Sequence, residues 1–354
     1  MTNLKMIRRV SCAVMLAVVF LSAGCRTKTE TVLPPEPERV QNRAKDIAAL
    51  WGRDNVRSVL FREQDLTHYR AETGLPQLLR RLTGMKVNHA YLAVETADTL
   101  GSRSGREALA AMITAFHEAG ISCDMVLPQH LFLAKRSATV LHRAFGGKDT
   151  PFEDLFHEAL RLKRHLPDEV PAPGITVWAG IHRLTAGNEA LPPGMLYRWS
   201  EENYGIGSDN DILMKQFLAD LARYQKMAKV DNIRFSVAIP ALYHAKASAG
   251  MLSAGRVTDF LQTADTVLVM GYGNKPSEYL KSLQEMLGSD SSGRVRCGMV
   301  LSGHVSESVG ALRRRSWQDF FRILSVMHRS CGNMPGYGGM VLIPWQNVEL
   351  LQER

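Results

Sequence analysis

The chain has 354 residues, a formal net charge of +8 at pH 7 and 45% hydrophobic residues, which is enough apolar material for at least one large core. Its basic residues are dispersed, and the short run at residues 313–315 is not interleaved with aromatic residues. Nucleic-acid-binding proteins usually carry clustered basic residues with aromatic residues among them, so the composition argues against a nucleic-acid partner.

Residues 1–24 have the charge and length pattern of a secretory signal peptide: a basic start, then an apolar stretch at residues 10–21 that is too short to span a bilayer. Small residues then lead to Cys25 in the order Leu-Ser-Ala-Gly-Cys. This ending resembles the lipobox of bacterial lipoproteins, although Ser22 stands where leucine is preferred. The resemblance implies that Cys25 is acylated and becomes the first residue of the mature protein. The alternative is an ordinary cleaved signal peptide followed by a chance cysteine.

Residues 25–47 are rich in Pro, Glu, Thr and Arg and poor in large apolar residues, which predicts a flexible, extended tether. Residues 48–354 contain no second linker and predict one domain, although this length also allows two. Acyl chains bind a bilayer in proportion to their buried methylenes. The sequence therefore predicts a protein of the bacterial cell envelope, anchored by lipid at Cys25 to the outer membrane or cell surface.

Eight short apolar runs alternate with helical patterns, the clearest of which covers residues 211–230 with apolar residues at three- and four-residue steps. This alternation predicts parallel strands, and eight such units predict an α/β fold, a closed (β/α)8 TIM barrel. The competing open sheet usually has a glycine-rich turn after its first strand, and residues 60–70 contain no glycine. The runs are residues 56–61, 89–95, 122–128, 174–181, 233–240, 266–273, 295–303 and 338–345.

The active site of such a barrel forms at the carboxyl ends of the strands, where this sequence places polar and aromatic residues. Flat aromatic faces beside hydrogen-bonding groups suit sugar rings, so a polysaccharide or glycan is the predicted partner. The alternative is that the aromatic residues pack at the barrel mouth without a ligand. Glycines on both sides of Tyr272 are expected to allow a tight turn that exposes its ring. The predicted substrate-binding residues are Glu63, Glu95, His182, Tyr243, Tyr272 and Trp345.

Three segments resemble the chitinase-like glycoside hydrolases of family 18. Residues 270–272 (Met-Gly-Tyr) match the Met-x-Tyr segment at the end of strand six, and residues 338–341 lead to Trp345 as in strand eight of that family. "FSVAIPALY" resembles the segment of strand five. The resemblance implies that Tyr272 helps to hold the reacting group of the substrate and that Trp345 forms the floor of the sugar site.

The catalytic motif of family 18, aspartates leading to a glutamate on strand four, is absent from "GITVWAGIHRL", and Gly273 replaces the aspartate that usually follows the strand-six tyrosine. Glycoside hydrolysis generally needs two carboxyl groups facing across the bond. Glu189 follows Asn188 after strand four and Glu307 follows strand seven, so they are the candidate catalytic pair. The alternative is a non-catalytic lipoprotein that binds glycan or acts as a scaffold, and the sequence leaves open whether the protein is an enzyme.

No metal site or cofactor is predicted, because the histidines lack HxH or HExxH spacing and no phosphate-binding loop appears. Cys123, Cys297 and Cys331 remain in the predicted domain. Cys297 begins strand seven, and Cys331 lies in the loop entering strand eight. Both are therefore expected at the amino-terminal side of neighbouring strands, close enough for a disulfide. Cys123 is then expected to be a buried free thiol.

Overall fold

The computed structural model describes residues 38–50, 55–69, 74–129, 151–181, 199–271, 276–300 and 317–343. Eight parallel strands form a closed barrel in sequence order, and β8 pairs with β1. The predicted (β/α)8 TIM barrel is confirmed, and an open sheet is excluded. The strands are β1 (Val56–Phe61), β2 (His89–Ala93), β3 (Ser122–Pro128), β4 (Gly174–Trp178), β5 (Phe235–Pro240), β6 (Thr266–Gly271), β7 (Val295–Val300) and β8 (Tyr337–Ile343).

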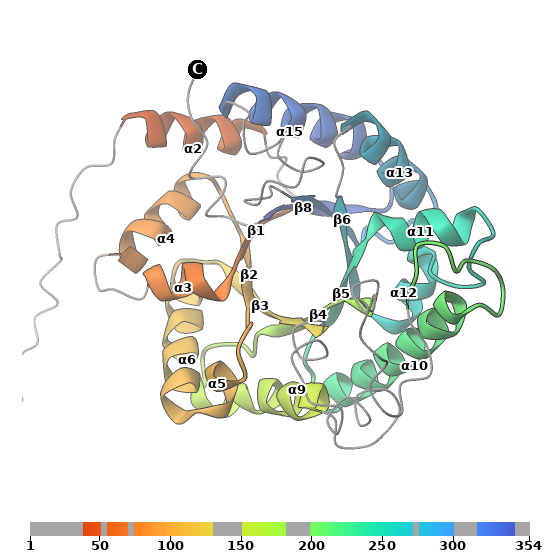
Figure 1. The fold of residues 1–354 in the computed structure, drawn as a ribbon. Coiled ribbons are helices and arrows are strands. Elements are labelled where there is room, and N and C mark those ends of the chain that lie inside the picture. Colours follow the sequence, from red (N-terminus) through yellow and green to blue (C-terminus); the bar gives the residue numbers. More distant parts are fainter. Residues whose placement is uncertain are drawn as a thin grey trace, which may run out of the picture. The chain divides into compact units, whose positions relative to one another are not determined.

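Helices surround the barrel, and each segment that joins two strands contains at least one of them (Figure 1). No helix in the described parts of the chain is long and apolar enough to cross a membrane. The described helices are α2 (Glu38–Leu50), α3 (Glu63–Tyr69), α4 (Gly74–Gly84), α5 (Ala97–Gly101), α6 (Arg103–Glu118), α9 (Pro151–Arg161), the 3₁₀ helix η1 (Leu162–His165), α10 (Asp209–Val230), α11 (Ala241–Ser248), α12 (Val257–Thr263), α13 (Pro276–Gly288) and α15 (Trp317–Cys331).

Helix α2 shortens the predicted tether. The composition of residues 38–47 predicts an extended chain, but these residues belong to α2, which lies between α4 and α15 (Figure 1). Ile47 is fully buried, and Ala44 packs against the core. The prediction is wrong for this segment because Ala44, Ile47 and Ala48 recur at helical spacing and form one apolar stripe, which the polar composition obscures.

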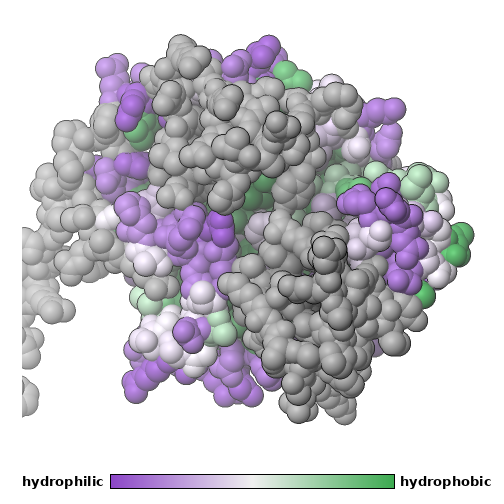
Figure 2. Space-filling view, viewed as in Figure 1, coloured by the Kyte–Doolittle hydropathy of each residue, from purple (hydrophilic) through white to green (hydrophobic). Residues whose placement is uncertain are grey.

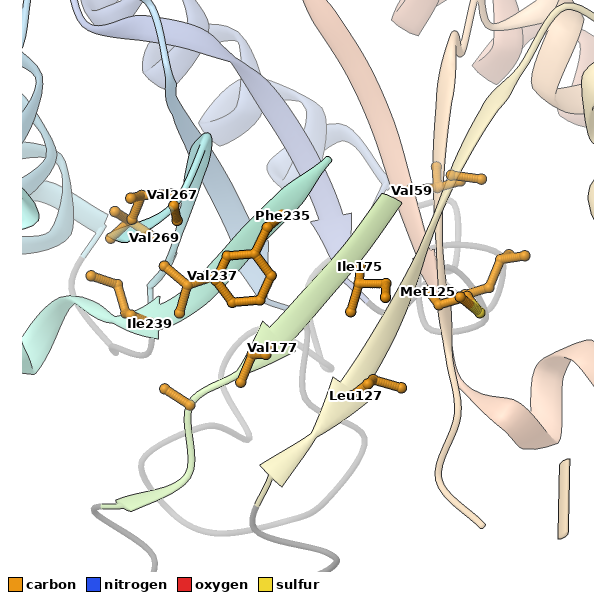
Figure 3. Packing of buried hydrophobic residues seen from close by; sticks show 14 of the residues in the cluster. Val59, Met125, Leu127, Ile175, Val177, Phe235, Val237, Ile239, Val267 and Val269 are labelled. Carbon is orange, nitrogen blue, oxygen red and sulfur yellow. The ribbon is translucent and has the colours of Figure 1, made fainter. Parts of the chain in front are cut away.

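Alternate side chains of the strands belong to two separate apolar clusters, as the two-residue period of a strand requires. Residues such as Val59, Ile175 and Val237 point away from the barrel axis and pack with the helices (Figure 3). The intervening residues, such as Leu60 and Leu268, fill the barrel interior. The strands are thus buried on both faces, which explains why they read as continuous apolar runs in the sequence.

The amino-terminal end of the barrel interior holds charged and polar side chains. The carboxylate of Asp124, on β3, is fully buried and pairs with Arg234 just before β5. It also accepts a hydrogen bond of 3.1 Å from the hydroxyl of Thr176 and lies 3.6 Å from Nε2 of His89. A Cβ atom on Gly174 would lie 2.2 Å from this carboxylate, so only glycine leaves room for it.

The charges of this cluster are compensated by buried partners. Arg296, on β7, donates a hydrogen bond to the hydroxyl of Tyr91. Burial by itself would raise the pKa of Asp124, but His89 and the guanidinium groups of Arg234 and Arg296 lower it below the usual range of a carboxyl group. Burial lowers the pKa of His89 and outweighs the opposing effect of Asp124. The amino-terminal end is therefore a buried polar network, and residues at this end of the fold generally serve stability.

Candidate functional site at the carboxyl end of the barrel

The carboxyl end of the barrel differs from the amino-terminal end because its inner layer is apolar. Val126, Ala238, Met270 and Ile343 are buried there, and Trp178 and Val300 pack against them while remaining partly exposed. In a space-filling view, hydrophilic, intermediate and hydrophobic residues are mixed on the described surface of this face (Figure 2). Ligand sites are commonly lined by apolar side chains with a few polar groups, so the apolar layer makes this end of the barrel the candidate site.

Arg62 and Glu95 form a two-point ion pair at the ends of β1 and β2. Nε of Arg62 donates to Oε1 of Glu95 at 2.9 Å, and Nη2 donates to Oε2 at 3.2 Å. The hydrogen bond to Glu95 raises the pKa of Arg62. Both residues continue the inward-facing rows of Leu60 and Ala93. The side chain of Arg62 is 41% exposed and that of Glu95 is 15% exposed, so the pair remains accessible at the rim of the apolar floor.

Glu63, predicted as a substrate-binding carboxylate, is instead held by the chain segment after β2. Its Oε2 accepts hydrogen bonds from the backbone nitrogens of Glu95, at 2.6 Å, and Thr96, at 2.7 Å. Its Oε1 accepts from the hydroxyls of Thr96 and Thr99 at the start of α5. Both oxygens are thus engaged within the protein, and this carboxylate positions the backbone that presents Glu95.

Tyr243, predicted to contact sugar, is a core residue. Its side chain is fully buried in the layer between strands and helices. The ring lies 5.5 Å from the centre of the Trp199 ring and 6.3 Å from that of Phe260. The prediction is wrong because β5 ends at Pro240 and α11 begins at Ala241, so the helix directs Tyr243 away from the barrel mouth.

Trp178 is the residue that the sequence reasoning missed. It is the last residue of β4 and packs against the inner apolar cluster, whereas its neighbour Val177 faces the helices. Two signals in the sequence point to it: the period of two within strand four, and its place in the segment that replaces the catalytic motif of family 18. It places a partly exposed aromatic side chain at the carboxyl end of the inner layer.

Gly271 makes room for an aromatic ring, while the tight turn predicted around Tyr272 lies outside the described residues. A Cβ atom there would lie 2.1–2.3 Å from three atoms of the Tyr279 ring, which comes from α13. The hydroxyl of Tyr279 donates to the carbonyls of Val269, at 3.1 Å, and Gly298, at 2.7 Å. Glycine at position 271, the last residue of β6, therefore lets the Tyr279 ring of α13 pack directly against β6 and β7.

The remaining predicted site residues lie outside the described part of the chain: Tyr272, Trp345, His182, Glu189, Glu307 and the anchor Cys25. The separation between the candidate catalytic carboxylates therefore stays a prediction. Among the described residues, no group of three or more His, Cys, Asp or Glu side chains is arranged to hold a metal ion.

A cavity of about 410 Å³ lies near the ends of α9 and α10, which lead into the amino-terminal ends of β4 and β5. Basic side chains interact favourably with the carbonyl groups at helix C-termini, which explains the basic residues that line this cavity without a ligand. The cavity is lined by His157, Leu160, Arg161, Lys163, Arg164 and Asp231.

Comparison with family models gave no match. A search of curated proteins also gave none. The fold is similar to that of the PgaB (BpsB) glycoside hydrolase domain from Bordetella bronchiseptica, at 12% identity and a TM-score of 0.50, over 83% of this chain and 95% of that one.

A chitinase from Chromobacterium violaceum ATCC 12472 matches at 13% identity and a TM-score of 0.48, over 83% and 98% of the two chains. A GH18 chitinase from Pseudoalteromonas aurantia matches at 14% identity and 0.45, over 80% and 92%. The structural neighbours of this chain therefore include chitinase-like and other glycoside hydrolase barrels, and the likeness to the first of them shows a shared fold.

Proposed function

We propose that this protein is an exported lipoprotein that binds polysaccharide at the carboxyl end of its barrel. The observation that carries the proposal is the partly exposed Trp178 on the inner apolar floor, with the Arg62–Glu95 pair at the rim. An aromatic face stacks on the apolar C–H face of a sugar ring, and the paired carboxylate and guanidinium groups hydrogen-bond its hydroxyls.

Strand β4 favours binding over hydrolysis of the family-18 type. Its inward side carries Thr176 and Trp178, and Gly180 follows two residues later, so these positions supply no carboxyl group. A family-18 mechanism depends on the glutamate at the end of strand four. The strand-four segment of this chain lacks that glutamate, which supports the proposal that the family-18 mechanism does not operate here.

We expect Tyr272 and Trp345 to extend the proposed site. Met270 and Ile343 belong to the inner cluster. Tyr272 lies two residues after Met270, and Trp345 lies two residues after Ile343. The two-residue period of a strand predicts that both aromatic side chains face the same cavity as Trp178. Together they would provide stacking surfaces for one or more sugar units.

Hydrolysis by another pair of carboxylates is the second candidate function, because Glu189 and Glu307 follow β4 and β7. If they are catalytic, Glu189→Gln and Glu307→Gln each abolish the release of reducing sugar while leaving polysaccharide binding intact. Binding without any reducing-sugar release by the unmodified protein would leave the pair without a catalytic role.

The proposal is tested with a panel of insoluble polysaccharides that includes chitin, mannan, cellulose and peptidoglycan. Trp178→Ala is expected to weaken binding by roughly tenfold or more, as for an aromatic residue at the centre of a binding surface. The matched control is Phe321→Ala, which removes a partly buried aromatic ring from the outer helix α15. Equal binding by both variants would refute the role of Trp178.

The lipid anchor is tested separately at Cys25. Cys25→Ser is expected to move the protein from the membrane fraction to the soluble exported fraction, because an unacylated chain loses the affinity contributed by the buried methylenes. Retention of the serine variant on membranes would contradict lipid anchoring.

A further inference from the structure

A serine, a histidine and an aspartate form a row at the amino-terminal opening of the barrel, at the other end from the proposed glycan site. Ser122 begins β3 and pairs in register with His89, which begins β2. Oγ of Ser122 lies 2.7 Å from Nδ1 of His89, and Nε2 of His89 lies 3.6 Å from Oδ1 of Asp124. Ser122 is exposed, whereas the other two side chains are buried. The row therefore runs from the protein surface into the barrel interior.

The surroundings of the His89 ring determine which of its nitrogens carries the proton. Nε2 is buried and has no hydrogen-bond partner among the described residues, and the carboxylate of Asp124 faces it. An Nε2–H group is attracted to this negative charge, whereas a lone pair there would be repelled. Burial lowers the pKa of His89, so the ring is neutral at pH 7. With its one proton on Nε2, the ring presents Nδ1 to Ser122 as a hydrogen-bond acceptor.

Asp124 is held so that its charge stays beside the ring. Arg234 pairs with its carboxylate, and the hydroxyl of Thr176 donates to Oδ2 at 3.1 Å. At 3.6 Å the carboxylate is beyond a direct hydrogen bond to His89, so it acts on the ring through its charge. A proton that arrives at Nδ1 is stabilised by that charge. These are the roles of the base and the orienting carboxylate in a Ser-His-Asp triad, with the two ring nitrogens exchanged.

A second exposed serine lies beside a buried histidine, but with the opposite polarity. Oγ of Ser248 is 3.2 Å from Nε2 of His244, and the backbone nitrogen of Val257 donates to Nδ1 at 3.2 Å. Nδ1 is therefore the acceptor of this ring, whose pKa burial also lowers, and the single proton lies on Nε2. That proton faces Ser248, so Nε2 has no lone pair to take the proton of this hydroxyl. Ser248 is thus a matched internal control for Ser122.

The cysteines of the described barrel are less accessible nucleophiles than Ser122. Cys123, Cys297 and Cys331 are buried free thiols. The prediction for Cys123 is confirmed, and the disulfide predicted between the other two is not formed. Cys331 is not in a loop before β8, because α15 continues through it. A reagent in solution therefore meets the hydroxyl of Ser122 but not these three sulfur atoms.

We propose that Ser122 is a nucleophilic serine, activated by His89, that carries out acyl transfer from carboxylic esters. A serine beside a neutral histidine serves this class of reaction through a covalent intermediate. The hydroxyl of Ser122 also donates to the backbone carbonyl of Asn88 at 3.1 Å, a longer contact than that with His89. This second contact keeps Oγ beside the ring, and the exposed position leaves room for an ester to approach.

Each half of the reaction moves one acyl group and one proton. Oγ of Ser122 bonds to the carbonyl carbon of the ester while its proton passes to Nδ1 of His89. The alcohol leaves with that proton, and the acyl group remains on the serine. Water then attacks this acyl-serine, its proton passing through His89 to Oγ as the carboxylic acid is released.

The first test is labelling of the full-length protein with a fluorophosphonate, which phosphonylates an activated serine and releases fluoride. Peptide mapping by mass spectrometry is expected to find the adduct on Ser122 and not on Ser248. Ser122→Ala is expected to remove the adduct without disturbing the fold, because the side chain is exposed. The proposal is overturned by the absence of an adduct on Ser122, or by equal labelling of the two serines.

His89→Gln tests the base. Labelling of Ser122 is expected to slow by roughly 100-fold or more, since a positioned general base contributes about 10²–10⁴-fold. An unchanged rate in the folded variant would refute the role of His89. If circular dichroism shows that His89→Gln does not fold, the comparison of Ser122 with Ser248 in the unmodified protein still decides the question.

Release of p-nitrophenol from p-nitrophenyl acetate measures the acyl transfer itself. The unmodified protein is expected to release it faster than Ser122→Ala, and equal rates would contradict the proposal. Polysaccharide binding by Ser122→Ala is expected to be unchanged, because the two sites lie at opposite ends of the barrel. The outcome at Ser122 is therefore independent of the outcome for the proposed glycan site.

Discussion

Gly271→Ala tests how the end of β6 is held beneath the candidate site. The added Cβ atom would lie 2.1 Å from Cζ of Tyr279, well inside any van der Waals contact. The ring is not free to move aside, because its hydroxyl donates to the carbonyls of Val269 and Gly298. Moving the ring therefore breaks these contacts and removes an aromatic side chain from the packed layer.

The expected cost follows from these contacts. The Tyr279 hydroxyl has one proton, so its contacts with the two carbonyls count as one shared hydrogen bond of about 0.5–1.5 kcal/mol, and complete loss of a buried large aromatic ring costs about 3–5 kcal/mol. Because Tyr279 is only partly buried, Gly271→Ala is expected to lower the free energy of unfolding by about 2–4 kcal/mol. Urea denaturation followed by far-ultraviolet circular dichroism measures this value.

A double-mutant cycle gives the sharper result. Gly271 does not adopt a positive φ angle, so alanine fits its backbone once the ring is absent. In a Tyr279→Ala background, Gly271→Ala is therefore expected to be neutral or stabilising by about 0.5–1 kcal/mol, because alanine reduces the entropy of the unfolded chain. An equal cost in both backgrounds would refute the steric explanation.

Two further predictions concern charge. Glu95→Gln leaves the guanidinium of Arg62 without its carboxylate. The ratio of binding to acidic over neutral polysaccharides is expected to rise about fivefold, and the free energy of unfolding to change by less than about 1 kcal/mol. An unchanged ratio in a binding assay would place the pair outside the site. His89 has a lowered pKa in the folded protein, so stability is expected to fall as the pH drops below 6.5. Asp124 adds a further loss below about pH 4, because its carboxyl group takes up a proton in the unfolded chain while it stays charged in the folded protein. Denaturation at a series of pH values in His89→Gln should lack the first of these losses.

The barrel could be predicted from the sequence because its strands are buried on both faces. Runs such as residues 266–271 are continuously apolar, and helical patterns separate them, so the count of strands and their parallel pairing follow from local signals. The predicted strand ends were less accurate than the strand count, since β4 ends at Trp178 and the predicted run ends at residue 181. The run continues past the strand because Ala179 and Ile181 are buried as well.

The site could be predicted only where neighbouring residues determine it. Glu95 lies just after the end of β2, where the order of the strand places it, and its role in binding stays a prediction. The role of Glu63 depends on backbone groups 32 and 33 residues away, and no sequence pattern encodes that contact. Tyr243 failed for a related reason, because a helix begins immediately after β5 and reverses the direction in which the side chain points.

The distribution of charge along the barrel axis bears on which ligands the mouth accepts. Asp124 is satisfied at the amino-terminal end, and its partners are separated from the mouth by the apolar inner layer. Among the described residues, a ligand at the carboxyl end would meet Trp178 and the paired charges of Arg62 and Glu95, which carry no net charge between them. A strongly anionic polymer gains little from a guanidinium already bound by a carboxylate, whereas a neutral sugar both stacks and hydrogen-bonds. Neutral polysaccharides are thus the first candidates for binding assays.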